Sequence, residues 1–252
     1  ENGSVVLNAD DKFYKYFETK ALKRNLKVIS FSKKNQSDIK LEKIKRQKNI
    51  SIVKVNIKGT SRNFKIKRNL ESFPENILAS LAVISNFFDL NNISNKFFFN
   101  YNLPPGRGDY KIIKFNKKKI HLIDESYNSN PLSLDFALKN FNKLQRNSKR
   151  KIILLGDMLE LGKFSKKLHL DVAKIVNKTN INRVYVYGKR ITYAYNKIRP
   201  QKRGKILYSS KDVSNFLKND IKDGEYLMVK GSNSTGLNEM MKKLKLGKIN
   251  AI

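Results

Sequence analysis

The amino-acid sequence predicts an α/β protein of two parts, the second of which is a Rossmann-like layer with a mostly parallel sheet. Three observations support this prediction. Apolar runs of strand length recur along the chain, stretches of helical periodicity lie between them, and the alternation is most regular in the second half. Strands that alternate with helices form right-handed βαβ units, whose parallel sheet is covered on both faces.

The first part has the pattern of a mixed α/β fold. Apolar runs of four to eight residues predict strands, and apolar side chains three and four residues apart predict helices. Alternation on either side of Gly59-Thr60-Ser61, with Ile50 and Ile52 before it and Phe64 and Ile66 after it, is typical of a hairpin. The expected elements are a strand and turn over 4–11, a helix over 12–25, a strand over 27–32, a hairpin over 49–68 and a helix over 74–90.

A break near the middle separates the two parts. The segment "NYNLPPGRGDY", residues 100–110, contains Pro104-Pro105-Gly106, which cannot continue a helix. Beyond it the expected strands are 119–124, 151–157, 183–188, 205–209 and 226–232. The helix expected over 131–144 has a core face of Leu134, Ala137, Leu138, Phe141 and Leu144. The helix after the second of these strands carries Leu168, Val172, Ile175 and Val176.

Composition excludes several classes of function. Cysteine is absent, which removes disulfides, thiol catalysis and cysteine-ligated metals. His121 and His169 are the only histidines, so a site with several histidine ligands is excluded as well. No apolar run approaches membrane-helix length, and no signal-peptide pattern opens the chain. Because the chain begins with Glu1 rather than Met, we expect a segment of a longer, cytoplasmic protein.

The net charge favours a second interpretation. Lysine and arginine number 53 against 21 acidic residues, a formal charge of +32, which is typical of proteins that bind nucleic acid. The basic residues are mostly lysine, however, and they are scattered through every segment. Arginine, whose planar fork suits phosphates and bases, supplies few of them. A basic nucleic-acid-binding module therefore stays open as an alternative.

Ligands of an open α/β sheet bind at the carboxyl ends of its strands. In the second part these ends are Asp124-Glu125-Ser126, Gly156-Asp157, Gly188-Lys189, Ser209-Ser210 and Lys230-Gly231-Ser232. The same residue types also serve as ordinary helix caps. Asp124 could accept hydrogen bonds from ribose hydroxyls, and the guanidinium of Arg107 could fork onto a phosphate. A cap at Asp124 and a linker arginine on the surface are the structural alternatives.

No phosphate loop is present in the sequence. The segment "GDMLELGK" follows a strand and precedes a helix, but five residues separate Gly156 from Gly162 where a phosphate loop has four. Phe164, rather than Ser or Thr, follows the lysine. Asp157 and Glu160 would also repel a triphosphate.

In their order and spacing, several motifs resemble the Mur ligase family. The motifs are "VLNADD", "NILASLAV", "PPGRGD", "LIDESYNSNPLSLDFAL", "ILLGDMLELG" with the following His169, and "LMVKGSNS". The resemblance covers essentially the whole chain. It implies that residues 1–104 are the C-terminal part of the family's central ATP-binding domain and that residues 105–252 are its Rossmann-like C-terminal domain.

The resemblance also implies roles for individual residues. Asn76 matches an asparagine that faces the adenine, Arg107 a hinge arginine that contacts the nucleotide, and Asp124 an aspartate that binds the ribose. The residues implied at the face where substrates meet are Tyr127, Asn128, Asp157, Glu160, Lys230 and Ser232. Two departures affect the grip on nucleotide and substrate: Ser72-Phe73 stands where the family has Gly-x-His, and Asn233 replaces an arginine.

The implied chemistry is ATP-dependent amide-bond formation through an acyl phosphate. Within the family the motifs are most like those of ligases that add D-alanyl-D-alanine to UDP-N-acetylmuramoyl-tripeptide during peptidoglycan precursor synthesis. The resemblance implies ATP and Mg²⁺ as cofactors, with the catalytic phosphate loop and magnesium ligands outside this chain, so that the chain alone is expected to be inactive. We expect a monomer without nucleic-acid partners or transmembrane segments. Another Mur-type or folylpolyglutamate-type ligase is the enzymatic alternative.

Overall fold

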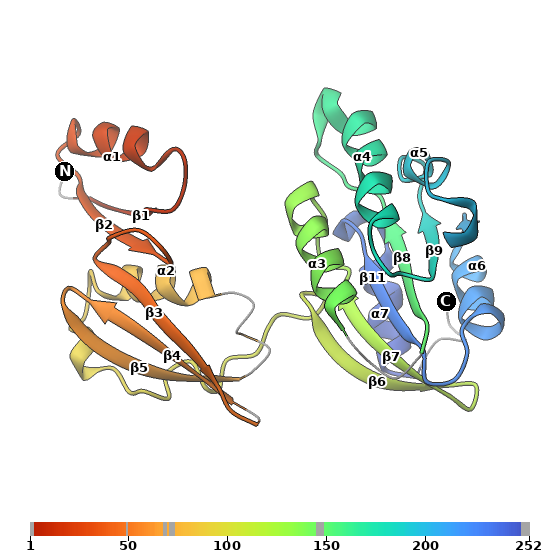
Figure 1. The fold of residues 1–252 in the computed structure, drawn as a ribbon, viewed down its shortest axis with the longest axis horizontal. Coiled ribbons are helices and arrows are strands. Elements are labelled where there is room, and N and C mark those ends of the chain that lie inside the picture. The colour runs from red at the N-terminus through yellow and green to blue at the C-terminus, as the bar shows by residue number, and fades with distance from the viewer. Residues whose placement is uncertain (1–2, 49, 68–69, 71–73, 145–148, 248–252) are drawn as a thin grey trace. The chain divides into compact units, whose positions relative to one another are not determined.

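The computed structural model describes residues 3–48, 50–67, 70, 74–144 and 149–247. The chain divides into two compact units, Glu1–Asn102 and Leu103–Ile252, which are drawn in Figure 1 and are described here one at a time. The sequence motifs had placed the border between residues 104 and 105. No helix within the described ranges combines the length and apolar character that a membrane crossing requires.

The first unit is built on a five-stranded sheet in the order β1-β2-β3-β4-β5. The first three strands pair in parallel and the last three in antiparallel fashion. Helix α2 packs on β2 and β3, and its Leu78 and Leu81 are fully buried. The elements are β1 (Ser4–Asn8), α1 (Tyr14–Leu22), β2 (Lys27–Ser32), β3 (Ile39–Arg46), β4 (Ile50–Ile57), β5 (Thr60–Lys67) and α2 (Pro74–Ile84).

Three details of the first unit differ from the prediction. Strand β3 was not expected, because its exposed lysines hide the alternation. The hairpin turns at Lys58-Gly59, both with positive φ, and the strand before it buries Ser51, Val53 and Val55 rather than Ile50 and Ile52. Helix α2 ends at Ile84 instead of continuing to residue 90; just beyond its end the Ser85 hydroxyl donates to the Ala82 carbonyl at 2.8 Å, and Phe88 is exposed.

The second unit is a Rossmann-like layer, which confirms the predicted fold class. Its six-stranded sheet has the order β10-β9-β8-β11-β7-β6, and every neighbouring pair is parallel except β6 with β7. The edge strand β6 was not predicted, since it starts directly after the Pro-Gly segment. The strands are β6 (Asp109–Phe115), β7 (Lys118–Glu125), β8 (Lys151–Gly156), β9 (Arg183–Tyr187), β10 (Arg203–Leu207) and β11 (Tyr226–Lys230).

Helices cover both faces of this sheet (Figure 1). On one face pack α3 (Pro131–Lys143), α4 (Ser165–Asn177) and α5 (Thr192–Tyr195). On the other face pack α6 (Ser210–Asn215), the adjoining π-helical turn (Phe216–Asp220) and α7 (Leu237–Lys245). The chain therefore leaves β11 toward the opposite face from that taken after its neighbours β7 and β8. In open α/β sheets ligands bind at such a reversal, in the crevice outside the carboxyl ends of the strands. In this unit the crevice denotes the position where β7, β8 and β11 end.

Several lysines of the second unit bind the carbonyl groups at helix ends. The Lys151 ammonium donates to the Asn142 carbonyl in the last turn of α3 at 2.7 Å, and the Lys202 ammonium donates to two carbonyls at the end of α4. Lys118 does the same for the π-helical turn, and Lys111 for α7. Cations at these positions satisfy unpaired carbonyls and complement the helix dipole. Part of the basic composition thus has a structural role.

Candidate functional site

A buried ion pair lies in the crevice where β7 and β11 end side by side. The Lys230 ammonium is 3.6 Å from a carboxylate oxygen of Glu125, and it donates a 2.9 Å hydrogen bond to the Asn128 carbonyl. Only 1% of the Lys230 side chain is exposed. Burial lowers the pKa of Lys230, and the nearby Arg107 lowers it further. Burial likewise raises the pKa of Glu125, although Lys230 opposes that shift.

The loop that precedes β6 rests directly on the turn that follows β7. The Tyr127 amide donates to the Gly106 carbonyl at 3.0 Å, and the Gly108 amide donates to the Asp124 carbonyl at 2.8 Å. Gly106 has φ +80°, and a Cβ atom there would lie 2.9 Å from the Tyr127 nitrogen. Only glycine tolerates both that conformation and that approach. The "PPGRGD" motif therefore forms a structured loop against the crevice.

This loop presents Arg107 at the crevice. The guanidinium carbon lies 4.5 Å above the centre of the Tyr127 ring, and both residues are exposed. A cation over an aromatic face is attracted by the ring and restricted in orientation. Arg107 and Tyr127, which lie 20 positions apart in the sequence, are thus brought together, with the donors of the guanidinium open to an anionic ligand.

Asp124 occupies a different environment from the one expected. Its side chain is fully buried. One carboxylate oxygen accepts hydrogen bonds from the amide and the hydroxyl of Ser126, and the other is paired with the ammonium of Lys245. A ribose could reach this carboxylate only after Lys245 or Ser126 had released it, so the predicted ribose contact stays a prediction.

Sequence reasoning missed Glu125 as a site residue. Successive residues of a strand point to opposite faces, so the two acidic residues at the end of β7 cannot share one environment. Asp124 points inward, whereas Glu125 is 19% exposed at the crevice. Strand alternation was the signal available in the sequence, because Leu122 and Asp124 fall on the buried side of β7.

The loop after β8 is held by buried hydrogen bonds. An oxygen of Asp157 accepts from the amides of Arg190 and Ile191, at 2.9 and 2.7 Å, so this side chain joins β8 to the segment after β9. The fully buried His169 accepts from the Met158 amide at 3.0 Å through Nε2, and its Nδ1 lies 2.7 Å from the Ser165 carbonyl. Burial lowers the pKa of His169, which favours the neutral ring that this pattern requires.

The remaining predicted residues of the second unit border the same loops. Ser232 accepts from the Leu159 amide at 2.9 Å and donates to the Ser129 carbonyl, so it ties β11 to its neighbours. Asn128 and Glu160 are exposed, and Glu160 has φ +60°. The side-chain oxygen of Asn233, at the departure from the family pattern, accepts a 2.9 Å hydrogen bond from the side-chain amide of Asn238.

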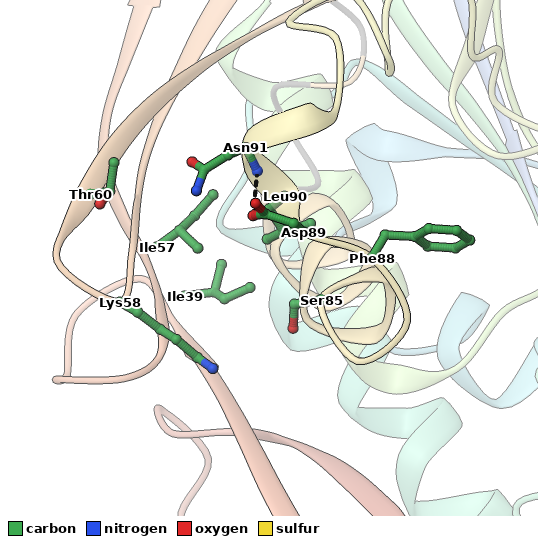
Figure 2. Close-up of a pocket in the computed structure, with 9 residues that line it drawn as sticks. All are labelled: Ile39, Ile57, Lys58, Thr60, Ser85, Phe88, Asp89, Leu90 and Asn91. Carbon is green, nitrogen blue, oxygen red and sulfur yellow. Dashed lines mark hydrogen bonds between the residues drawn. The ribbon is translucent and has the colours of Figure 1, made fainter.

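Asn76 belongs to the other unit, on the exposed side of α2. The departure at Ser72-Phe73 lies outside the described residues. The first unit also has a pocket of about 220 Å³ between the β4–β5 turn and the segment after α2 (Figure 2). Its lining mixes apolar and polar side chains, and Asp89 among them already accepts from the Asn91 amide at 2.9 Å. The pocket is smaller than the usual ligand cavities of about 300–1,000 Å³ and contains no predicted site residue.

The described side chains do not form a recognisable metal site. No three histidine, aspartate or glutamate residues of the described ranges gather closely enough to hold a metal ion. We therefore assign no Mg²⁺ ligand to them and derive no step through a metal.

Comparisons with known proteins relate both units to the same family. A model of the Mur ligase middle domain matches residues 1–84, and a model described as Mur ligase, glutamate ligase domain matches residues 111–233. The UDP-N-acetylmuramoyl-tripeptide--D-alanyl-D-alanine ligase of Buchnera aphidicola subsp. Acyrthosiphon pisum (strain APS) is 29% identical over 260 aligned positions, which cover 96% of this chain and 52% of that protein. The chain spans about half the length of the curated relatives that it matches from end to end.

Solved structures share the fold. A crystal structure of MurF from Acinetobacter baumannii has a TM-score of 0.75 at 21% identity, covering 97% of this chain and 52% of that one. The crystal structure of the MurF ligase from Thermotoga maritima in complex with ADP has a TM-score of 0.73 at 20% identity, covering 100% of this chain and 55% of that one.

Proposed function

The chain belongs to the Mur ligase family, and from that membership we propose that it takes part in the ATP-dependent addition of D-alanyl-D-alanine to UDP-N-acetylmuramoyl-tripeptide. The observation that carries the proposal is the agreement along 96% of the chain with a relative of that name. The ADP bound in the Thermotoga maritima relative supports ATP as the nucleotide. In this proposal the terminal carboxylate of the tripeptide takes the γ-phosphoryl group of ATP and ADP leaves. The amine of the dipeptide then attacks the acyl phosphate, so that the amide bond forms and inorganic phosphate and a proton are released.

We propose a division of roles that follows the two units. Residues 1–104 form the end of the central ATP-binding domain, with Asn76 on the side of α2 that would meet the adenine. Residues 105–252 form the C-terminal domain, which supplies the dipeptide site and Arg107 for the nucleotide. The activity belongs in the cytoplasm, where ATP and nucleotide-activated precursors occur, and a monomer suffices for it.

Within the second unit we assign the nucleotide to the loop that carries Arg107. The guanidinium, held over Tyr127, is oriented to bind phosphate oxygens through its paired donors. Glu125, the partly exposed carboxylate at the end of β7, would accept hydrogen bonds from the ribose, while the buried Asp124 would hold the loop from inside the fold.

We assign the dipeptide to the neighbouring loops after β7, β8 and β11. Asn128 and Glu160 are exposed there. Asp157, Lys230 and Ser232 are tied to backbone groups of the adjoining loops, so they shape this surface.

The structure weakens the case for the nucleic-acid alternative. Lysines such as Lys151 and Lys202 are directed at helix carbonyls rather than at solvent, so net charge overstates the free basic surface. The remaining alternative is a Mur-type ligase that adds a different amine, and the experiment must distinguish it from a ligase that adds D-alanyl-D-alanine.

The proposal is tested by titrating the ¹⁵N-labelled 252-residue chain with D-alanyl-D-alanine, with L-alanyl-L-alanine, with D-glutamate and with ATP. We expect amide shifts at Asn128, Glu160 and Ser232 with the D-dipeptide, and at Gly106 and Gly108 with ATP. The L-dipeptide is the matched control and should shift neither group. Equal responses to both dipeptides, or a response to D-glutamate instead, would reject the proposed amine.

A further inference from the structure

Lys245, in the last turn of α7, places its ammonium between two carboxylates. It is paired with Asp109 at the start of β6 and with Asp124 at the end of β7. The lysine side chain is only 13% exposed, and that of Asp124 is fully buried. A single cation on α7 thus joins the hairpin of β6 and β7, from which it is remote in the sequence.

The same two carboxylate residues hold the backbone on either side of Arg107. A carboxylate oxygen of Asp109 accepts a 2.7 Å hydrogen bond from the Gly106 amide. The Asp124 carbonyl accepts a 2.8 Å hydrogen bond from the Gly108 amide. Both amides that flank Arg107 are therefore bound by residues that Lys245 holds in place.

Removing the cation would leave two like charges facing each other. Asp124 cannot turn away, because it is buried and bound by Ser126, whereas the Asp109 side chain is 32% exposed and can turn to solvent. Repulsion between the carboxylates would favour that rotation, which frees the Gly106 amide. Burial by itself lowers the pKa of Lys245, but the two carboxylates outweigh it and raise the pKa, so the lysine keeps its charge.

We infer that Lys245 is a positioning residue for Arg107, acting through Asp109 and Asp124 on the amides of Gly106 and Gly108. Lys245 lies on the side of the Asp124 carboxylate away from Ser126 and contacts neither Arg107 nor Tyr127 among the described interactions. The inference rests on the proposed function only in assigning a nucleotide to Arg107; the order of the loop can be measured without a ligand.

The test is amide hydrogen exchange, followed by NMR in the 252-residue chain. In Lys245→Met, which keeps the length of the apolar stem, exchange at Gly106 should accelerate at least about ten-fold, as expected for the loss of its charge-assisted bond to Asp109. Exchange at Gly108, whose amide donates to the Asp124 carbonyl, should accelerate with it as the loop loosens. Exchange in the centres of β8 and β9 should stay as in the wild type. Lys242→Met, on the same helix but exposed and paired with Glu239, is the matched control and should leave both amides slow.

Two further variants separate positioning from general stability. Lys245→Arg keeps the cation, so exchange at Gly106 and Gly108 should stay as slow as in the wild type. Adding Asp109→Asn to Lys245→Met removes one of the facing charges but leaves an acceptor for the Gly106 amide, so it should restore most of the protection.

Unchanged exchange at Gly106 and Gly108 in Lys245→Met would overturn the inference, and so would an equal acceleration throughout β7, β8 and β11. Addition of ATP gives a separate answer. If the Arg107 side-chain signal of the wild type ignores ATP while Lys245→Met loosens the loop, the nucleotide role of Arg107 fails and the control of the loop by Lys245 stands.

Discussion

Replacing Gly106 with alanine tests how the site is built, because the structure separates two costs at this position. The first is the positive φ of +80°, which costs an alanine about 1–2 kcal/mol. The second is the approach of the new Cβ to the Tyr127 nitrogen at 2.9 Å. Relieving that contact breaks the 3.0 Å bond from the Tyr127 amide to the Gly106 carbonyl, which costs roughly 1 kcal/mol more.

Gly224 provides the control, since its φ of +76° is nearly the same. An added Cβ there would meet only the flexible end of Lys149, at 3.1 Å, and that side chain can move. Gly224→Ala should therefore show the backbone cost alone. The free energy of unfolding of the second unit, measured by urea denaturation, should fall by about 2–3 kcal/mol in Gly106→Ala and by ~1–2 kcal/mol in Gly224→Ala. Equal losses in the two variants would refute the close approach of the loop to Tyr127.

Three further predictions concern buried polar groups. Burial lowers the pKa of His169 in the folded chain, so the unfolded chain binds the proton first as the pH falls. Stability should therefore decrease as the pH drops below about 6.5 toward the folded pKa. Thermal melts at several pH values should show this dependence in the wild type and a flatter one in His169→Gln. Lys151→Met should lower the free energy of unfolding by about 1–2 kcal/mol, whereas Lys174→Met, which removes an exposed pair with Asp171, should change it by less than ~0.5 kcal/mol; similar losses would count against the helix-end role of Lys151. Asp124→Asn should destabilise the second unit by roughly 2 kcal/mol or more, because it breaks the buried ion pair with Lys245. If the variant instead keeps its stability and no longer responds to ATP, Asp124 contacts the nucleotide directly.

Local pattern predicted the architecture because the elements of the second unit are regular. The strand at 151–156 is buried along its whole length, and α3 buries Leu134, Ala137, Leu138 and Phe141 as its periodicity predicts. The strands β3 and β6 were missed, because lysines on their exposed sides mask the alternation. Strand β6 also lies at the edge of its sheet, and with only one buried face its apolar signal is weak.

The environment of the site residues could not be predicted from local sequence. Asp124 meets Lys245 only after β6, β7 and α7 have packed, so nothing near Asp124 in the sequence announces its partner. The placement of Arg107 over Tyr127 likewise depends on the positive φ of Gly106. Motif spacing located the loops of the crevice, but tertiary packing decides which side chains remain open to a ligand.

The central claim is tested most directly by identifying the amine that is ligated. The segment of the Buchnera aphidicola relative that precedes the region of similarity would be joined to residues 1–252. The resulting enzyme would be given ATP, UDP-N-acetylmuramoyl-tripeptide and an equimolar mixture of D-alanyl-D-alanine, L-alanine and D-glutamate. The intact relative is the positive control. Mass spectrometry should find a UDP-linked product extended by D-alanyl-D-alanine, formed with one ADP per product. A product extended by a different amine, or ligation that does not require ATP, would contradict the account.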